Sequence, residues 1–193
     1  MTRKAKLFWA LFVSFLVLDQ LTKWWVYTNL AEGPGGDAIA VIPGVFDIVH
    51  AQNPGAAFSL FRDMPYNHLF FLGFTAVATW IVWDQYKRLK PEAIWVPAAL
   101  GLILSGAVGN AIDRVHKRTV TDFLRVYVSD PEWAAWLRQT VGMSEWPSFN
   151  VADSALLVGV VIFFIATWRE DEETASAAQA SGEHADAAAT GTG

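Results

Sequence analysis

The sequence predicts an α-helical integral membrane protein with four transmembrane helices. Four segments are almost continuously apolar, and each approaches the ~20 residues with which an α-helix crosses a ~30 Å hydrocarbon core. Tryptophans stand at the segment ends, as interfacial aromatic anchors do. Hydrophobic residues make up 53% of the 193-residue chain and charged residues 17%. A soluble bundle of buried helices is the alternative, but its helices would carry polar stripes, which these segments mostly lack.

The first predicted span covers residues 7–26. Basic residues precede it, as in a secretory signal peptide, so cleavage has to be considered. No small-residue cleavage site follows the apolar stretch. Instead the sequence continues through Asp19, Lys23 and the bulky pair Trp24 and Trp25. We therefore expect an uncleaved membrane helix.

Three further spans are predicted, at residues 65–83, 93–112 and 151–168. Lys and Arg residues precede the first span and occupy the short 84–92 loop, which makes both regions cytoplasmic by the positive-inside rule. The 113–150 loop also contains basic residues, so the positive-inside rule does not hold for every loop. We base the orientation on the residues before the first span and on the short 84–92 loop. Both termini are then cytoplasmic, and the 27–68 and 113–150 loops lie outside.

The outer loops are expected to fold into a small β-cradle and a short helix. Apolar residues alternate over 39–50 around Pro43-Gly44, which is typical of two short strands joined by a turn. Asn53-Pro54-Gly55 is a further turn signal. In the second loop, Asp130 is placed to cap a helix that starts with Pro131. Apolar residues at helical spacing then predict an amphipathic helix that lies on the membrane or over the site: Trp133, Trp136, Leu137 and Val141.

Residues 170–193 are predicted to be a disordered cytoplasmic tail after a membrane-embedded domain at residues 1–169. The tail holds six of the 19 acidic residues, no basic residue and no large apolar residue, so it cannot offset the entropy cost of ordering. Binding of a partner protein is its alternative role. Without the tail, the formal net charge of -5 becomes +1, so the acidity says little about the membrane domain.

Polar residues from three predicted spans lie together at the outer membrane face. Polar residues in or near the membrane are costly, so their presence suggests a functional site. Asp19 and Lys23 are one helical turn apart and can form an ion pair, which alone is more typical of structure than of catalysis. Asn110, Asp113 and Arg114 share one helical face, where Arg114 is expected to hold Asp113 ionised. We assign that cluster to scaffolding and substrate positioning.

Two further carboxylates are candidates for chemistry. Asp122 lies in a β-prone segment that returns to the membrane, and Asp153 lies in the first turn of the last span. If they meet, they cannot both ionise easily and will share a proton, so that one acts as base and the other as acid. The spacing by itself does not show that they meet.

Other chemistries lack support in the sequence. The histidines are scattered, and the chain has no cysteine, which excludes disulfides, thiolate metal ligands and a cysteine nucleophile. No nucleophile elbow and no phosphate-binding glycine loop is present. We therefore expect no metal, no cofactor and no nucleic-acid partner.

Five motifs occur in a recognisable order within the four predicted spans and their loops. They are Asp19-Gln20-Leu21-Thr22-Lys23, Asn53-Pro54-Gly55-Ala56-Ala57-Phe58, Gly109-Asn110-Ala111-Ile112-Asp113-Arg114, Val120-Thr121-Asp122-Phe123 and Phe149-Asn150-Val151-Ala152-Asp153. Together they closely resemble the bacterial lipoprotein signal peptidase family, also called type II signal peptidases, over residues 7–168. The segment between Asp122 and Asn150 is longer than the family pattern, and the acidic tail lies outside it.

The resemblance implies an aspartic endopeptidase of the inner membrane that cleaves diacylglyceryl-modified prolipoproteins just before the lipidated cysteine. It places the catalytic aspartates at Asp122 and Asp153. It also implies sensitivity to the cyclic peptide globomycin, and we expect a monomer that contacts membrane lipid. Supporting roles fall on Asp19, Lys23, Asn53, Asn110, Asp113, Arg114 and Asn150. An ion-coupled transporter or channel subunit, or a non-catalytic factor that binds lipoproteins, remains the alternative.

Overall fold

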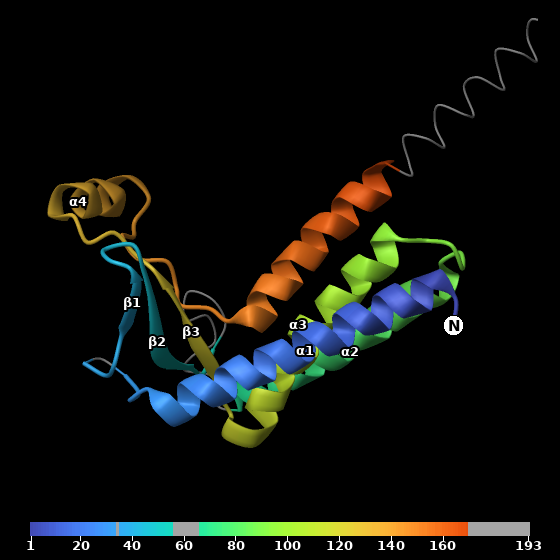
Figure 1. The fold of residues 1–193 in the computed structure, drawn as a ribbon, viewed down its shortest axis with the longest axis horizontal. Coiled ribbons are helices and arrows are strands. Elements are labelled where there is room, and N and C mark those ends of the chain that lie inside the picture. The colour runs from blue at the N-terminus through green and yellow to red at the C-terminus, as the bar shows by residue number, and fades with distance from the viewer. Residues whose placement is uncertain (34, 56–65, 170–193) are drawn as a thin grey trace, which may run out of the picture.

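The computed structural model describes residues 1–33, 35–55 and 66–169. The predictions for Ala56-Ala57-Phe58, for the start of the second span at residue 65 and for the 170–193 tail lie outside these residues. Five helices and three strands are described (Figure 1). They are α1 (Arg3–Asn29), β1 (Ile39–Ile42), β2 (Phe46–Asn53), α2 (Asn67–Arg88), α3 (Trp95–Lys117), β3 (Val120–Val126), α4 (Pro131–Thr140) and an unlabelled last helix (Val151–Arg169).

Three of the described helices are long and apolar enough to cross a membrane, namely α1, α3 and the last helix. The second predicted span also forms a helix, α2, but its composition does not mark it as a span in the same way. It begins with Asn67 and His68 and carries Thr75 and Thr79, which lower its mean hydropathy. The structure therefore supports three of the four predicted spans by composition.

The helices extend beyond the apolar segments from which they are predicted. α1 starts at Arg3 and ends at Asn29, and α3 continues through Lys117. Backbone hydrogen bonding continues while polar side chains reach water at the membrane surface, so apolar runs underestimate helix length. α3 ends where Arg118 adopts a left-handed conformation with φ 64° and its N–H donates to the carbonyl of Arg114.

Small residues let α3 pack closely against α1 and the last helix. A Cβ at Gly101 would meet the backbone of Phe8, and one at Gly106 would meet the backbone of Ala152. Close backbone approach of this kind is typical of helix contacts in membranes, where lipid removes the usual hydrophobic drive. A cluster of apolar side chains at the end near the N-terminus joins α1, α2, α3 and the last helix: Phe8, Val82, Val96, Leu100, Leu104 and Ala166.

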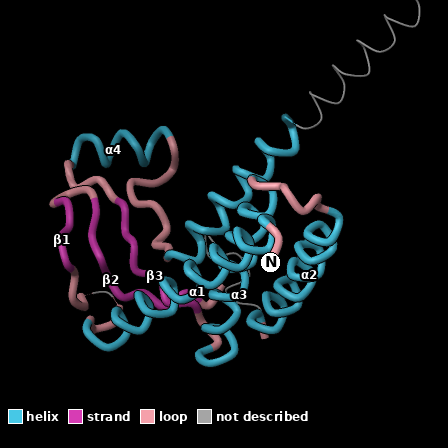
Figure 2. Tube along the Cα trace, turned by 45° about the vertical axis from the view of Figure 1, so that its right-hand side comes forward, coloured by secondary structure: helices cyan, strands magenta, loops and turns pink. Residues whose placement is uncertain are grey.

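The three strands form one antiparallel sheet in the order β1-β2-β3, beside the helices (Figure 2). The predicted turn at Pro43-Gly44 is confirmed, with Gly44 at φ 82° and the N–H of Val45 bonded to the carbonyl of Ile42. The predicted short helix is confirmed as α4, capped by the Asp130 side chain. In the sheet, Asp122 of β3 pairs with Ala51 of β2.

Candidate active site

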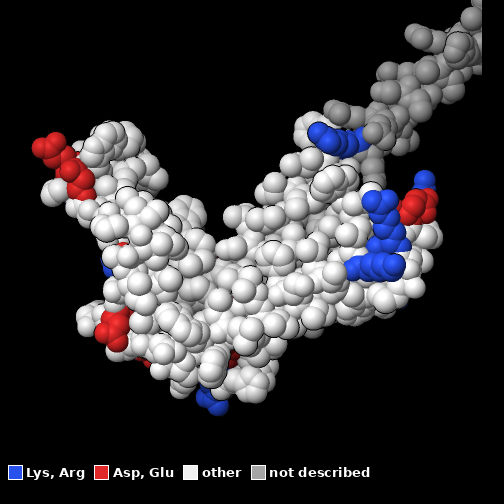
Figure 3. Space-filling model, in the orientation of Figure 1, with Lys and Arg blue, Asp and Glu red and all other residues white. Residues whose placement is uncertain are grey.

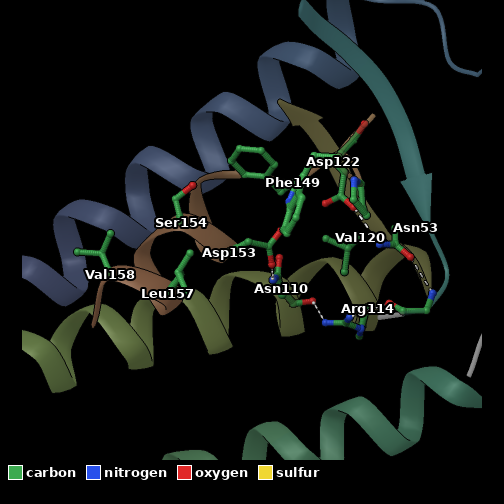
Figure 4. A pocket seen from close by; sticks show the side chains of 14 residues that line it. Asn53, Asn110, Arg114, Val120, Asp122, Phe149, Asp153, Ser154, Leu157 and Val158 are labelled. Atoms are coloured by element: carbon green, nitrogen blue, oxygen red, sulfur yellow. Dashed lines mark hydrogen bonds between the residues drawn. The ribbon is translucent and has the colours of Figure 1, made fainter. Parts of the chain in front are cut away.

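Asp122 and Asp153 line the same cavity, although they come from different elements (Figure 4). β3 supplies Asp122, and the first turn of the last helix supplies Asp153. The cavity has a volume of about 480 Å³. Its described lining includes Asn53, Gly55, Asn110, Arg114, Trp146, Phe149, Ser154, Leu157 and Val158.

Asn150 bridges the two carboxylates from a fully buried position. Its Nδ2 donates to Oδ1 of Asp122 at 2.7 Å, and its backbone N–H donates to Oδ2 of Asp153 at 3.1 Å. Its Oδ1 accepts the backbone N–H of Asp153 at 3.0 Å. One residue thus contacts both carboxylates, that of Asp122 through its side chain and that of Asp153 through its backbone.

Two more amides complete the hydrogen bonds of the carboxylates. Nδ2 of Asn53 donates to Oδ2 of Asp122 at 3.0 Å, and Nδ2 of Asn110 donates to Oδ1 of Asp153 at 2.7 Å. Each of the four carboxylate oxygens therefore receives one N–H donor from the protein. Both acids are held by neutral amides rather than by a direct salt bridge, so neither is locked in its ionised form.

The pKa of Asp122 is raised to about 7. Burial is the largest cause because it disfavours the charged form, and the negative charge of Asp153 adds to it. Donors from Asn53 and Asn150 and the charge of Lys23 act in the opposite direction. Near neutral pH the pair can thus hold one proton, which is the state needed for combined acid and base catalysis.

A buried chain of charges lies behind the two acids. Nζ of Lys23 is 3.0 Å from Oδ2 of Asp19 and 3.5 Å from Oδ2 of Asp113, and it donates to Oδ1 of Asn110 at 2.9 Å. The predicted ion pair between Asp19 and Lys23 is present. Because Lys23 holds the oxygen of Asn110, the amide nitrogen of Asn110 points at Asp153.

The expected pairing of Asp113 with Arg114 is wrong. Asp113 is paired with Lys23 and with Lys117, whose Nζ is 3.5 Å from Oδ1. Adjacent residues on a helix diverge by about 100°, so Arg114 cannot face the same partner. Its guanidinium donates to the carbonyl of Gly55 at 3.3 Å and lies over the Phe71 ring at 4.5 Å.

Some contacts at the site were missed by the sequence reasoning. Oδ1 of Asp19 accepts the backbone N–H of Ala152 at 2.9 Å, which ties α1 to the helix that carries Asp153. Oδ2 of Asp113 accepts the backbone N–H of Thr121, next to Asp122, at 3.0 Å. The contact of Lys117 with Asp113 could have been predicted, because the two residues are four apart on one helix. The two backbone contacts could not, because they join distant segments.

The arrangement has the parts of a peptidase that uses two aspartates. Within the described ranges, no cluster of three or more His, Asp or Glu residues is arranged to hold a metal ion. The model of the family described as Signal peptidase (SPase) II matches residues 11–169.

The chain belongs to the signal peptidase II family.

Curated relatives of this signal peptidase II chain are named lipoprotein signal peptidases. The lipoprotein signal peptidase of Geobacter sulfurreducens is 38% identical over 170 residues, which cover 88% of this chain and 96% of the relative. That of Nitratidesulfovibrio vulgaris is 36% identical over 157 residues, which cover 80% and 85%.

A solved bacterial membrane enzyme, studied by the in meso method, has a similar fold. It superposes with a TM-score of 0.70 at 26% identity, over 86% of this chain and 90% of its own. The protein is thus a peptidase of the bacterial membrane, and the transporter and assembly-factor alternatives are not favoured.

Proposed function

We propose that the lipoprotein signal peptidase activity of this protein resides in Asp122 and Asp153, which cleave a prolipoprotein just before its lipid-modified cysteine. The observation that carries the proposal is the joint position of the two acids. They come from separate elements, line one cavity and are oriented by the same buried residue, Asn150. The reciprocal bonds between Asn150 and Asp153 have the geometry of a capping box at the start of the last helix. Capping does not require the bond from Asn150 to Asp122 or the bond from Asn110 to Asp153, whereas general acid–base hydrolysis needs two acids oriented in one cavity.

The reaction uses one proton on the pair. The ionised aspartate takes a proton from water as the water oxygen attacks the scissile carbonyl carbon, and the protonated aspartate donates to the carbonyl oxygen. The tetrahedral intermediate then collapses: the C–N bond breaks as the leaving nitrogen takes the proton held by the pair, and one hydroxyl group of the intermediate returns its proton to the other aspartate as the C=O bond re-forms, so the pair again holds one proton. The products are a signal peptide with a new carboxyl group and a lipidated cysteine with a free amino group. The two roles belong to the pair as a coupled unit.

The amide side chains serve the acids. Asn53, Asn110 and Asn150 each donate to one of the two carboxylates, so we assign to them the orientation of the dyad. Asp19, Lys23 and Asp113 hold Asn110 and the adjoining backbone. Arg114 lines the cavity while its guanidinium contacts the Gly55 carbonyl and the Phe71 ring, so we assign it to holding the rim of the cavity. We propose that the enzyme acts as a monomer.

We further propose that α2 is the fourth span and that the site opens outside the cytoplasm. Val82 of α2 packs in one cluster with Leu100 and Leu104 of α3, so α2 accompanies α3 through the membrane. Basic side chains gather at the end of the molecule where α1 begins (Figure 3). There Nζ of Lys4 donates to the carbonyl of Leu89 at 2.7 Å. The positive-inside rule makes that end cytoplasmic, and the acids lie at the other end.

Cleavage of a purified prolipoprotein tests the function directly. A diacylglyceryl-modified substrate is expected to yield two products, and mass spectrometry should find the lipidated cysteine at the new N-terminus. The same substrate with serine in place of that cysteine serves as the control and should stay intact. Globomycin is expected to inhibit. Absence of cleavage by folded, membrane-inserted protein would contradict the proposal.

The pH dependence of cleavage should reflect the raised pKa of Asp122. The reaction needs one proton on the pair, so the rate is expected to fall as the pH rises through about 7 and that proton is lost. The amide of Asn53 favours the ionised form of Asp122, so Asn53→Ala should move the alkaline limb to higher pH. The kcat–pH profile measures both effects. An alkaline limb that does not move in Asn53→Ala would show that another group controls it.

A further inference from the structure

Helix α4 carries its tryptophans on the surface. Ala134 is its buried residue, with 5% of its surface exposed, whereas Trp133 and Trp136 are 63% and 53% exposed. Three residues apart, the two tryptophans share a face, and their rings meet edge to face with centroids 5.9 Å apart. Large aromatic side chains grouped on a surface mark an interaction site.

The position of α4 relative to the bundle identifies the partner. The strands run across the direction of α1 rather than continuing it (Figures 1 and 2), so the sheet spreads sideways from the end of that helix. At this end, Trp24 and Trp25 of α1 are exposed, as anchors at a membrane surface are. The N–H of Ser129, just before α4, donates to the carbonyl of Gly44 at 3.0 Å and fixes α4 to the β1–β2 turn. α4 therefore lies beside the bundle, close to the level where α1 leaves the membrane.

The surface between α4 and the last helix is hollowed and uncharged in the view of Figure 3. Acidic side chains at the α4 end lie on the edge turned away from the last helix. The last helix is a candidate span, and Leu157 and Val161 on it are 64% and 49% exposed.

We infer that α4 rests in the interfacial layer of the bilayer that the long helices cross, with Trp133 and Trp136 inserted among the lipids. Tryptophan favours this layer because its ring is apolar and its N–H can bond to headgroups or water. The anchor holds the far end of the sheet at the membrane surface, and β3 of that sheet carries Asp122. This inference concerns a lipid surface and does not depend on the roles of the two acids.

Spin labels test the inference, since the chain has no cysteine of its own. A nitroxide at Thr140→Cys lies on the helical face of Trp133 and Trp136, whereas one at Gln139→Cys, the matched control, is turned about 100° away. The protein is reconstituted in phosphatidylethanolamine–phosphatidylglycerol vesicles. The logarithm of the ratio of oxygen to nickel-chelate accessibility should be positive at residue 140 and negative at residue 139. In the double variant Trp133→Gln, Trp136→Gln, the value at 140 should also become negative.

Two results would overturn the inference. A negative value at residue 140 in the parent protein would place this face in water. Low accessibility to both reagents there would show that protein covers it, as in contact with a second copy. Both tryptophans are exposed and neither is among the described residues that line the cavity of the acids, so the double variant should still cleave substrate in detergent micelles. That retained cleavage shows that the variant is folded.

Discussion

Asp122→Asn and Asp153→Asn should each lower the rate of signal-peptide release by about 10²–10⁴-fold or more, the usual contribution of a positioned acid or base. Asparagine has nearly the same shape, but it neither accepts a proton from water nor donates one to a carbonyl oxygen. Either substitution removes the shared proton, so both variants should fail alike. The double variant should lose little beyond the single ones, because the two acids act as a unit.

The assay for this prediction is release of the signal peptide from a diacylglyceryl-modified prolipoprotein at saturating substrate. Asp130→Asn is the matched control, because it makes the same chemical change in the same outer region. Asn caps a helix about as well as Asp, so α4 should keep its start at Pro131. Membrane insertion of all variants is checked by fractionation. Full turnover by the Asp122 or Asp153 variant would refute the two-aspartate mechanism.

The positions of most helices can be predicted from the sequence because each helix depends on a local pattern of residues. Apolar length predicts α1, α3 and the last helix, and the Asp130-Pro131 pair predicts the start of α4. The α2 segment is weaker because threonines and a polar start dilute its apolar pattern. Its place in the bundle depends on packing against α3, which a one-dimensional pattern does not contain.

The site could be predicted in its residue types but not in its connections. Carboxylates and amides near one membrane face point to chemistry, yet the role of Asn150 between Asp122 and Asp153 appears only once β3 and the last helix are side by side. The last helix also approaches α3 closely at Gly106 and Gly109, where a Cβ would meet Ala152. The expected pair of Asp113 and Arg114 is the reverse case, a contact that was predicted and is not formed. Residues that are adjacent in sequence point in different directions from a helix.

Lys23→Met is expected to destabilise the protein by about 3–5 kcal/mol, the usual cost of removing one partner from a buried ion pair. Lys23 is 1% exposed, and its ammonium lies between the carboxylates of Asp19 and Asp113. Methionine fills similar space but leaves these two charges buried with less compensation. It also removes the shorter of the two hydrogen bonds to Oδ1 of Asn110 and leaves only the one from Asn150 at 3.2 Å, so the amide that orients Asp153 is held less firmly.

Lys117→Met is the matched control for this prediction, because Lys117 is the other lysine beside Asp113. Its side chain is 30% exposed, so water can replace much of the lost interaction and the change in stability should be much smaller. Thermal unfolding of both variants in the same detergent measures the difference. Equal losses would show that the burial of Lys23 does not decide its contribution. A lower melting temperature for Lys23→Met alone would show that the buried charges behind the acids stabilise the contacts among α1, α3 and the last helix.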